Sequence, residues 1–258
     1  MHSVGLLYTV SGFCVGALVG MTGVGGGSLM TPLLILLFGI HPASAVGTDL
    51  LYAAGTKTGG AAVHGFNRSV DWRLVGRLAG GSVPAAAATL FALSLFDLRG
   101  RPMQHFFSVA LGAALIVSAL AVIFRPRIAA WFAKVGEPRP AAAAILTVVL
   151  GAFLGVMVSL TSVGAGALGV TVLVLLYPRM PTPRIVGSDI AHAVPLTLVA
   201  GIGHLLLSTI DFRVLGLLLL GSLPGIFVGS QLAVRIPDAA LRAALSGVLI
   251  VVGSRLLL

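Results

Sequence analysis

The stretch Thr22-Gly23-Val24-Gly25-Gly26-Gly27-Ser28 is a polar, glycine-dense break between two apolar runs. Glycine adopts backbone conformations that other residues avoid and lets a ligand approach the chain closely. An apolar run starts directly after Ser28, so the N-terminal N–H groups of a helix there would point into the break and favour an anion. The hydroxyls of Thr22 and Ser28 would add hydrogen-bond donors. We interpret the break as one side of an anion path; the alternative is a plain turn between tightly packed helices.

The composition is that of a polytopic membrane protein. Of the 258 residues, 58% are hydrophobic and 9% are charged, whereas soluble domains are about half apolar and about one quarter charged. The apolar runs are continuous rather than alternating, which predicts an all-α protein with lipid-spanning helices. The net charge of +9 is spread over short loops without a basic patch, so we expect the lipid bilayer, and no nucleic acid, as a partner.

Ten apolar segments are predicted, and several are shorter than the ~20 residues that a full crossing needs. The two shortest follow glycine-rich stretches, so we expect broken or re-entrant helices at these places. The ten segments are 3–20, 28–40, 44–66, 74–95, 104–124, 141–158, 166–178, 185–208, 213–234 and 239–256.

The chain contains an internal repeat. The glycine break returns, less complete, as Thr161-Ser162-Val163-Gly164-Ala165-Gly166-Ala167 at an offset of 139 residues, and after one inserted residue the offset becomes 140. At the second offset Gly47-Thr48-Asp49 matches Gly187-Ser188-Asp189, and Asp71-Trp72-Arg73 matches Asp211-Phe212-Arg213. Short, glycine-interrupted segments in corresponding places of two repeats indicate the substrate site of a transporter.

The basic residues predict an orientation. If the ten segments alternate in direction, 11 of the 16 Lys and Arg residues fall on the side of the polar stretch 125–140, and 4 fall on the other side. The positive-inside rule then places this stretch in the cytoplasm and both termini outside. Five segments per repeat is an odd number, so a first repeat (1–124) and a second repeat (141–258), joined by a cytoplasmic linker (125–140), would have inverted topologies.

Lys57 is the strongest single candidate for substrate binding. It lies 13 residues into the segment 44–66, or roughly 20 Å, which is deep in a ~30 Å hydrocarbon core. A lysine at that depth is costly unless it faces a cavity or a partner; snorkelling to an interface is the alternative. It belongs to a stripe of polar and small residues at helical spacing. In the second repeat Thr197 occupies the corresponding position and offers a neutral donor.

The remaining titratable candidates lie on the same two segments. Asp49 and Asp189 fall in the first predicted turns, where capping of the helix dipole is one interpretation, and proton coupling or pairing with Lys57 is the other. His64 and His204 lie near segment ends, and His192 lies between them in the repeat. No metal-site spacing and no nucleotide-binding motif are present, so we expect neither metal nor cofactor.

Gly23 to Ser28, the following Pro32, Gly47-Thr48-Asp49 and their second-half counterparts resemble the TauE/SafE family of anion transporters, also called the sulfite exporter family. The resemblance covers essentially the whole chain. It implies a bacterial inner-membrane carrier for sulfite, sulfoacetate or related organosulfonates, usually in export. It also implies fewer membrane crossings than ten, which re-entrant pairing of the short segments would explain. Ala165 and Ala167 depart from the first-half pattern, so we expect the first break to dominate binding.

These observations predict a secondary carrier for a small sulfur-containing anion that works by alternating access. An anion channel with the same lining is the alternative, and an intramembrane enzyme is disfavoured because no nucleophile–base pair is evident. The oligomeric state does not follow from the sequence. Asp49, Asp189, His192, His64 and His204 would support the site or couple protons. The expected substrate-binding residues are Thr22, Gly23, Gly25, Gly26, Gly27, Ser28, Lys57, Thr161, Ser162, Gly164, Gly166 and Thr197.

Overall fold

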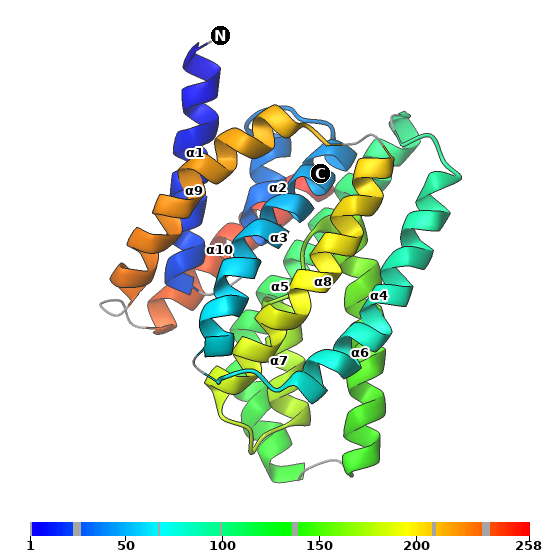
Figure 1. Cartoon of the computed structure of the whole chain (residues 1–258), viewed down its shortest axis with the longest axis vertical. Helices are drawn as coiled ribbons and strands as arrows, with labels where there is room; N and C mark the ends of the chain where they lie inside the picture. Colours follow the sequence, from blue (N-terminus) through cyan, green and yellow to red (C-terminus); the bar gives the residue numbers. More distant parts are fainter. Residues whose placement is uncertain are drawn as a thin grey trace.

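The computed structural model describes residues 2–22, 27–66, 68–98, 100–135, 139–207, 210–233 and 238–258. Within these ranges the chain forms helices joined by short connections, and no strand is found (Figure 1). The helices are α1 (His2–Thr22), α2 (Gly27–Leu36), α3 (Pro42–Phe66), α4 (Trp72–Ser94), α5 (Arg101–Val135), α6 (Pro140–Thr161), α7 (Ala167–Leu176), α8 (Thr182–Leu206), α9 (Phe212–Ala233) and α10 (Asp238–Leu257).

Each predicted apolar segment corresponds to one of these helices, which confirms the all-helical, polytopic fold. Among the described residues, six helices are long and apolar enough to cross a membrane: α4, α5, α6, α8, α9 and α10. Two helices, α2 and α7, have only ten residues. At 1.5 Å per residue each is about 15 Å long, roughly half of the ~30 Å hydrocarbon thickness.

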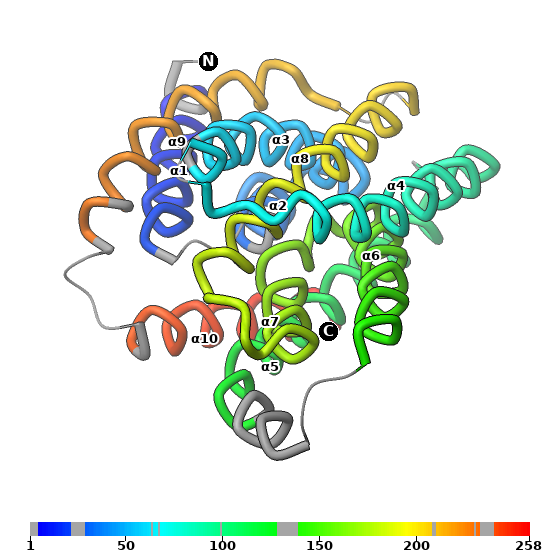
Figure 2. The backbone as a smooth tube through the Cα atoms, turned by 60° about the horizontal axis from the view of Figure 1, so that its bottom comes forward, coloured from blue at the N-terminus to red at the C-terminus, as the bar shows by residue number. Residues whose placement is uncertain are grey.

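The two flanks of the molecule are built by contacts between the halves of the chain. Helix α4 packs along α6 on one flank, and α1 packs along α9 on the other (Figure 1, Figure 2). A Cβ added to Gly151 of α6 would overlap the carbonyl oxygen of Leu78 on α4. The same overlap arises between their repeat counterparts, Gly12 of α1 and Leu218 of α9. Two further pairs repeat this relation: Gly155 with Ser82, and Gly16 with Ser222.

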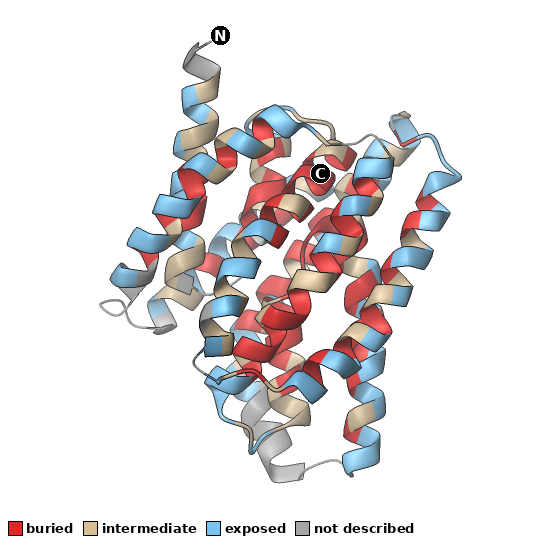
Figure 3. Ribbon diagram, viewed as in Figure 1, coloured by how far each residue is buried: buried red, intermediate tan, exposed pale blue. Residues whose placement is uncertain are grey.

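The centre of the molecule is the crossing of α3 and α8, which pack against each other. Figure 3 shows that buried residues gather on α3, α7 and α8, whereas the outer helices carry more exposed residues. Two reciprocal hydrogen bonds tie each central helix to the start of a flanking helix. The Asp71 N–H donates to Ser188 Oγ (2.8 Å), and the Asp211 N–H donates to Thr48 Oγ1 (3.2 Å). In both contacts, a central helix of one repeat binds the start of a flanking helix of the other repeat. The opposite orientation of the two repeats in the membrane stays a prediction.

One expected loop is largely helical. Residues 125–135, which the sequence places in the linker, continue α5 to Val135, and 136–138 lie outside the described residues. The 35 residues of α5 span about 52 Å, so the helix is longer than the hydrocarbon core and its basic end can extend into water. Polar composition there marks the end of the apolar span rather than the end of the helix.

Candidate substrate site

The second glycine break is a buried interruption between α6 and α7. Helix α6 ends at Thr161, and Ser162 caps it in the left-handed conformation (φ 59°). Gly164 and Gly166 have φ of 118° and 112°, values that side chains other than glycine rarely adopt. The Val163 N–H donates to Thr161 Oγ1 at 3.1 Å, while Ser162 Oγ is buried without a hydrogen-bond partner. The predicted break is thus confirmed in this half, and its glycines are required by the backbone.

The first glycine break is only partly described. Gly23, Gly25 and Gly26 lie outside the described residues, whereas Thr22 ends α1, and Gly27 and Ser28 begin α2. The side chains of Thr22 and Ser28 are likewise outside the description. The role expected for this break therefore stays a prediction.

Asp49 is the polar centre of the first half. Its carboxylate lies on α3 and is completely buried. Thr31 Oγ1 of α2 donates a hydrogen bond to one carboxylate oxygen (2.5 Å), so the short helix is tied directly to α3. The other oxygen, Oδ1, has no hydrogen-bond partner, although the side chain of Ser162 from the second break interacts with this carboxylate. Asp49 therefore ties the short helix α2 to α3 and lies close to the glycine break of the other repeat.

Asp189 occupies the equivalent place in the second half. It lies on α8 and is 1% exposed. The backbone N–H of Gly166, the residue that caps the N-terminus of α7, interacts with its carboxylate. A Cβ at Gly169 of α7 would overlap the same carboxylate. The N-terminal end of a helix favours negative charge, so in this structure a side-chain carboxylate holds the place predicted for a bound anion.

The placement of these two carboxylates corrects one sequence interpretation. Helices α3 and α8 start at Pro42 and Thr182, so Asp49 and Asp189 each lie seven residues, or about 10 Å, inside their helix. They are not in the first turn, and first-turn capping is wrong. The caps of the flanking helices are Asp71, which accepts from the N–H groups of Arg73 and Leu74, and its repeat counterpart Asp211.

Lys57 lies near both carboxylates. It is half-buried on α3, and its positive charge acts on both Asp49 and Asp189. It also acts on His192 of α8. Three titratable groups from two central helices therefore lie within the electrostatic reach of a single ammonium group. The structure thus brings together four of the residues that the sequence singled out: Lys57, Asp49, Asp189 and His192.

His192 has a partner that sequence reasoning missed. Its Nε2 lies 2.8 Å from Ser82 Oγ on α4, and its Nδ1 is buried without a hydrogen bond. At the repeat offset of 140, His192 corresponds to Tyr52 and Ser82 corresponds to Ser222. The hydroxyls of Tyr52 and Ser222 are also buried, and neither has a hydrogen-bond partner. The register of the repeat could have matched these positions to each other, whereas only the structure shows that Ser82 meets His192.

The other expected residues lie apart from this cluster or are engaged elsewhere. The Thr197 hydroxyl donates to the Ala193 carbonyl of its own helix (2.7 Å), and the Thr161 hydroxyl donates to Met157 O (2.7 Å). His64 Nδ1 lies 2.8 Å from Ser69 Oγ just beyond the end of α3. His204 Nε2 lies 2.9 Å from the Ser159 carbonyl. Across the described part of the chain, no three His, Cys, Asp or Glu side chains come together as metal ligands.

The chain matches known proteins along nearly its whole length. The family model described as sulfite exporter TauE/SafE matches residues 8–256. The chain is 38% identical over 252 residues to the probable membrane transporter protein YjnA of Bacillus subtilis (strain 168), across 95% of this chain and 97% of that protein. It is 25% identical over 233 residues to the probable membrane transporter protein YdhB of the same organism, across 90% of this chain and 92% of that protein. No solved structure matches.

Proposed function

The chain belongs to the TauE/SafE sulfite exporter family, and from this premise we propose that it exports a small sulfur oxyanion or organosulfonate, such as sulfite or sulfoacetate. It is a multi-pass membrane transporter and not an enzyme. The proposal concerns the substrate, the direction of transport across the inner membrane, and the mechanism. The observation that carries it is the position of Lys57, whose charge acts on two buried carboxylates at the crossing of α3 and α8.

An ammonium group shared by two carboxylates is suited to exchange one anion for another. A buried charge is costly unless it is paired, and here the charge of one cation acts on two fixed carboxylates. A substrate with one negative charge would bind Lys57 in place of one carboxylate. Asp189 is the group to be displaced, because its carboxylate interacts with the N-terminal end of α7, where the freed N–H groups would receive the substrate oxygens. Thr161, Ser162, Gly164 and Gly166 would then line the site on this side.

The same charge balance supports coupling to protons. Two ionised carboxylates and one ammonium leave one unpaired negative charge, which a single proton on Asp49 or Asp189 would neutralise. Arrival of a monovalent anion restores that negative charge and favours uptake of a second proton. His192 is the other titratable group close to Lys57 and could receive or pass on this proton. The proposal is therefore movement of one proton with each monovalent anion, in the same direction.

Alternating access would follow from the repeat. Reciprocal contacts of α4 with α6 and of α1 with α9 fit two halves related by an inverted two-fold axis, the arrangement of many secondary transporters. We place both termini outside and the basic stretch around 125–140 in the cytoplasm, on the positive-inside rule. The first break, Gly23 to Ser28, and Thr197 would complete the path opposite the second break.

Reconstituted liposomes test this function. We expect saturable counterflow of radiolabelled sulfite or sulfoacetate for the wild type and loss of flux for Lys57→Met. Arg73→Gln is the matched control, because Arg73 is an exposed cation on α4, and it should retain flux. Flux that rises linearly with concentration and shows no counterflow would instead identify an anion channel. Equal loss of flux in both variants would contradict the role of Lys57.

A further inference from the structure

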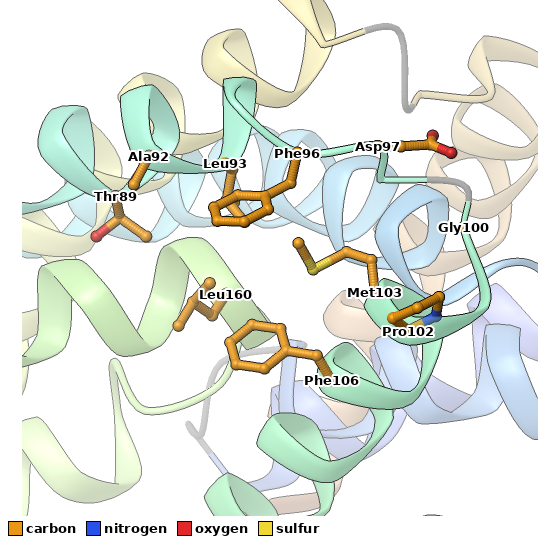
Figure 4. Close-up of a pocket in the computed structure, with 10 residues that line it drawn as sticks. All are labelled: Thr89, Ala92, Leu93, Phe96, Asp97, Gly100, Pro102, Met103, Phe106 and Leu160. Carbon is orange, nitrogen blue, oxygen red and sulfur yellow. The ribbon is translucent and has the colours of Figure 1, made fainter.

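A pocket lies between the end of α4 and the start of α5, and Lys57 is not among its lining residues. Its volume is about 770 Å³, within the range of ~300–1,000 Å³ that is usual for ligand pockets. Figure 4 shows Phe96, Met103 and Phe106 gathered opposite Leu160 of α6. The pocket is thus a sizeable cavity with mainly aromatic and aliphatic walls.

The pocket lies between two helices that are candidates to cross the membrane. Helices α4 and α5 follow each other in the chain, yet within the described residues they share few contacts, and α6 packs behind both. Both helices are long and apolar enough to cross the membrane. At the mouth, the side chains of Phe96 and Phe106 are 61% and 46% exposed. Because the mouth lies at the last turn of α4 and the first turns of α5, it is near one end of the membrane span.

The lining offers little to a polar solute. Among the described residues that line the pocket, Thr89 and Asp97 are the ones with polar side chains. The Thr89 hydroxyl already donates to the Ala85 carbonyl at 2.8 Å. Asp97 lies at one end of the pocket with its carboxylate turned away from Phe96 and Met103 (Figure 4). An apolar chain would therefore fill the interior better than the small anion proposed for the Lys57 site.

A cation lies next to the lining of this apolar pocket in the chain. Arg101 is the first residue of α5 and is exposed. It lies in the chain between Gly100 and Pro102, both of which line the pocket. A guanidinium group binds phosphate with two parallel hydrogen bonds. An apolar cavity at the end of a candidate membrane span, with an exposed arginine between two of its lining residues in the chain, suits both parts of a glycerophospholipid.

We propose that one acyl chain of a glycerophospholipid fills this pocket and that its phosphate binds Arg101. Met103 and Leu160 connect the bound chain to the interior, because both pack against the hydrophobic core to which the helices from α3 to α8 contribute. Leu160 directly precedes Thr161, the last residue of α6 before the glycine break. The lipid is therefore a structural ligand that supports the last turn of α6. This site does not depend on the identity of the transported substrate.

Native mass spectrometry of the detergent-purified protein, with phosphate analysis of extracted lipid, tests the proposal. We expect the wild type to retain a single phospholipid per chain. Ala92→Trp places a large side chain in the pocket, so this variant should lose the bound phospholipid. Ala87→Trp is the matched control on the same helix, because Ala87 is exposed and does not line the pocket, and it should retain the lipid. Arg101→Gln should weaken binding of added dioleoyl phosphatidylethanolamine about tenfold, the loss expected for one charge-assisted hydrogen-bonding group.

Three outcomes would overturn the proposal. One is equal retention of lipid by Ala92→Trp and the wild type. Another is equal thermal stabilisation of the wild type by monoolein, which lacks a phosphate, and by the phospholipid. The third is a wild-type protein free of phospholipid, with a second copy of the chain covering this face. If Ala92→Trp does not reach the membrane, the Arg101→Gln titration alone decides, and unchanged affinity would contradict the phosphate contact.

Discussion

Ser82 and His192, which are 110 positions apart in the chain, are joined by a 2.8 Å hydrogen bond in the buried interface between α4 and α8. The bond connects a flanking helix to the central helix that carries Asp189. The repeat places Ser222 and Tyr52 at the equivalent positions, and there both hydroxyls are buried without a hydrogen-bond partner, so the same two positions carry different chemistry in the two halves. The hydrogen bond of Ser82 therefore fixes an imidazole ring in one half, whereas the equivalent position in the other half holds a tyrosine ring.

Removing the Ser82 hydroxyl should destabilise the protein. In Ser82→Ala, Nε2 of His192 loses its partner inside the protein, and leaving a buried polar group unsatisfied costs about 1–3 kcal/mol. Thermal unfolding in detergent measures the loss. Ser94→Ala is the control on the same helix, because the Ser94 hydroxyl is exposed and donates to Phe91 O of its own helix. Equal stability of the two variants would show that the Ser82 contact contributes nothing.

Adding a methyl group at the flanking glycines should have similar effects in both halves. Gly151→Ala and Gly12→Ala each force a Cβ into a backbone carbonyl of the neighbouring helix, and overpacking of this kind costs typically 1–3 kcal/mol. Gly80→Ala and Gly247→Ala meet nothing within 4 Å and should be neutral or stabilising, because alanine favours helix more than glycine does. Chemical or thermal unfolding of the four variants compares them. Tolerance of alanine at Gly151 would rule out the close packing of α4 and α6.

A side chain at Gly166 should weaken the second break. Its φ of 112° lies in a region that is costly for other residues, at roughly 1–3 kcal/mol, and its N–H interacts with Asp189. We expect Gly166→Ala to lower both stability and transport. Gly59→Ala, which has open space for a Cβ, is the comparison. Wild-type transport by Gly166→Ala would mean that the break tolerates another backbone shape and has no special role.

Asp189→Asn should abolish the response of transport to a pH gradient. Protonation of this carboxylate accompanies anion binding in the proposed mechanism, so at fixed substrate wild-type binding should strengthen as the pH falls. An asparagine cannot bind or release the proton, so the flux through the Asp189→Asn variant should become independent of pH. Proteoliposomes with an imposed pH gradient provide the measurement, and Asp97→Asn, an exposed carboxylate outside the Lys57 cluster, is the control. A pH response that persists in Asp189→Asn would exclude this residue as the coupling group.

Most of the fold could be predicted from the sequence because hydrophobic length alone defines membrane helices. The helix starts were less accurate. Helix α3 begins at Pro42 and α8 at Thr182 followed by Pro183, earlier than predicted, because proline is favourable in the first turn of a helix. This difference moved Asp49 and Asp189 from the helix ends into the interior. The basic end of α5 was misread as a loop, since arginine and lysine are good helix formers once outside the lipid.

The candidate site was only partly visible in the sequence. Lys57, Asp49 and Asp189 stood out because charge is rare in membrane segments. Thr31 and Ser82 did not, because serine and threonine are ordinary in such helices and their partners lie far away in the chain. Thr31, for example, meets Asp49 across the connection between α2 and α3. Only the three-dimensional packing of α2 and α4 against the central helices reveals these partners.

The exchange of flanking helices has a consequence for how the molecule assembles and moves. Because α4 packs on α6, and α9 packs on α1, neither half of the sequence forms a separate lobe. Each half packs its outer helices against helices of the other half. Cutting the chain near residue 137 should therefore leave two fragments that stay interlocked and separate only on unfolding. The rigid bodies that rock during transport would each contain helices from both repeats. The arrangement is like that of a domain-swapped dimer whose two subunits have been fused into one polypeptide.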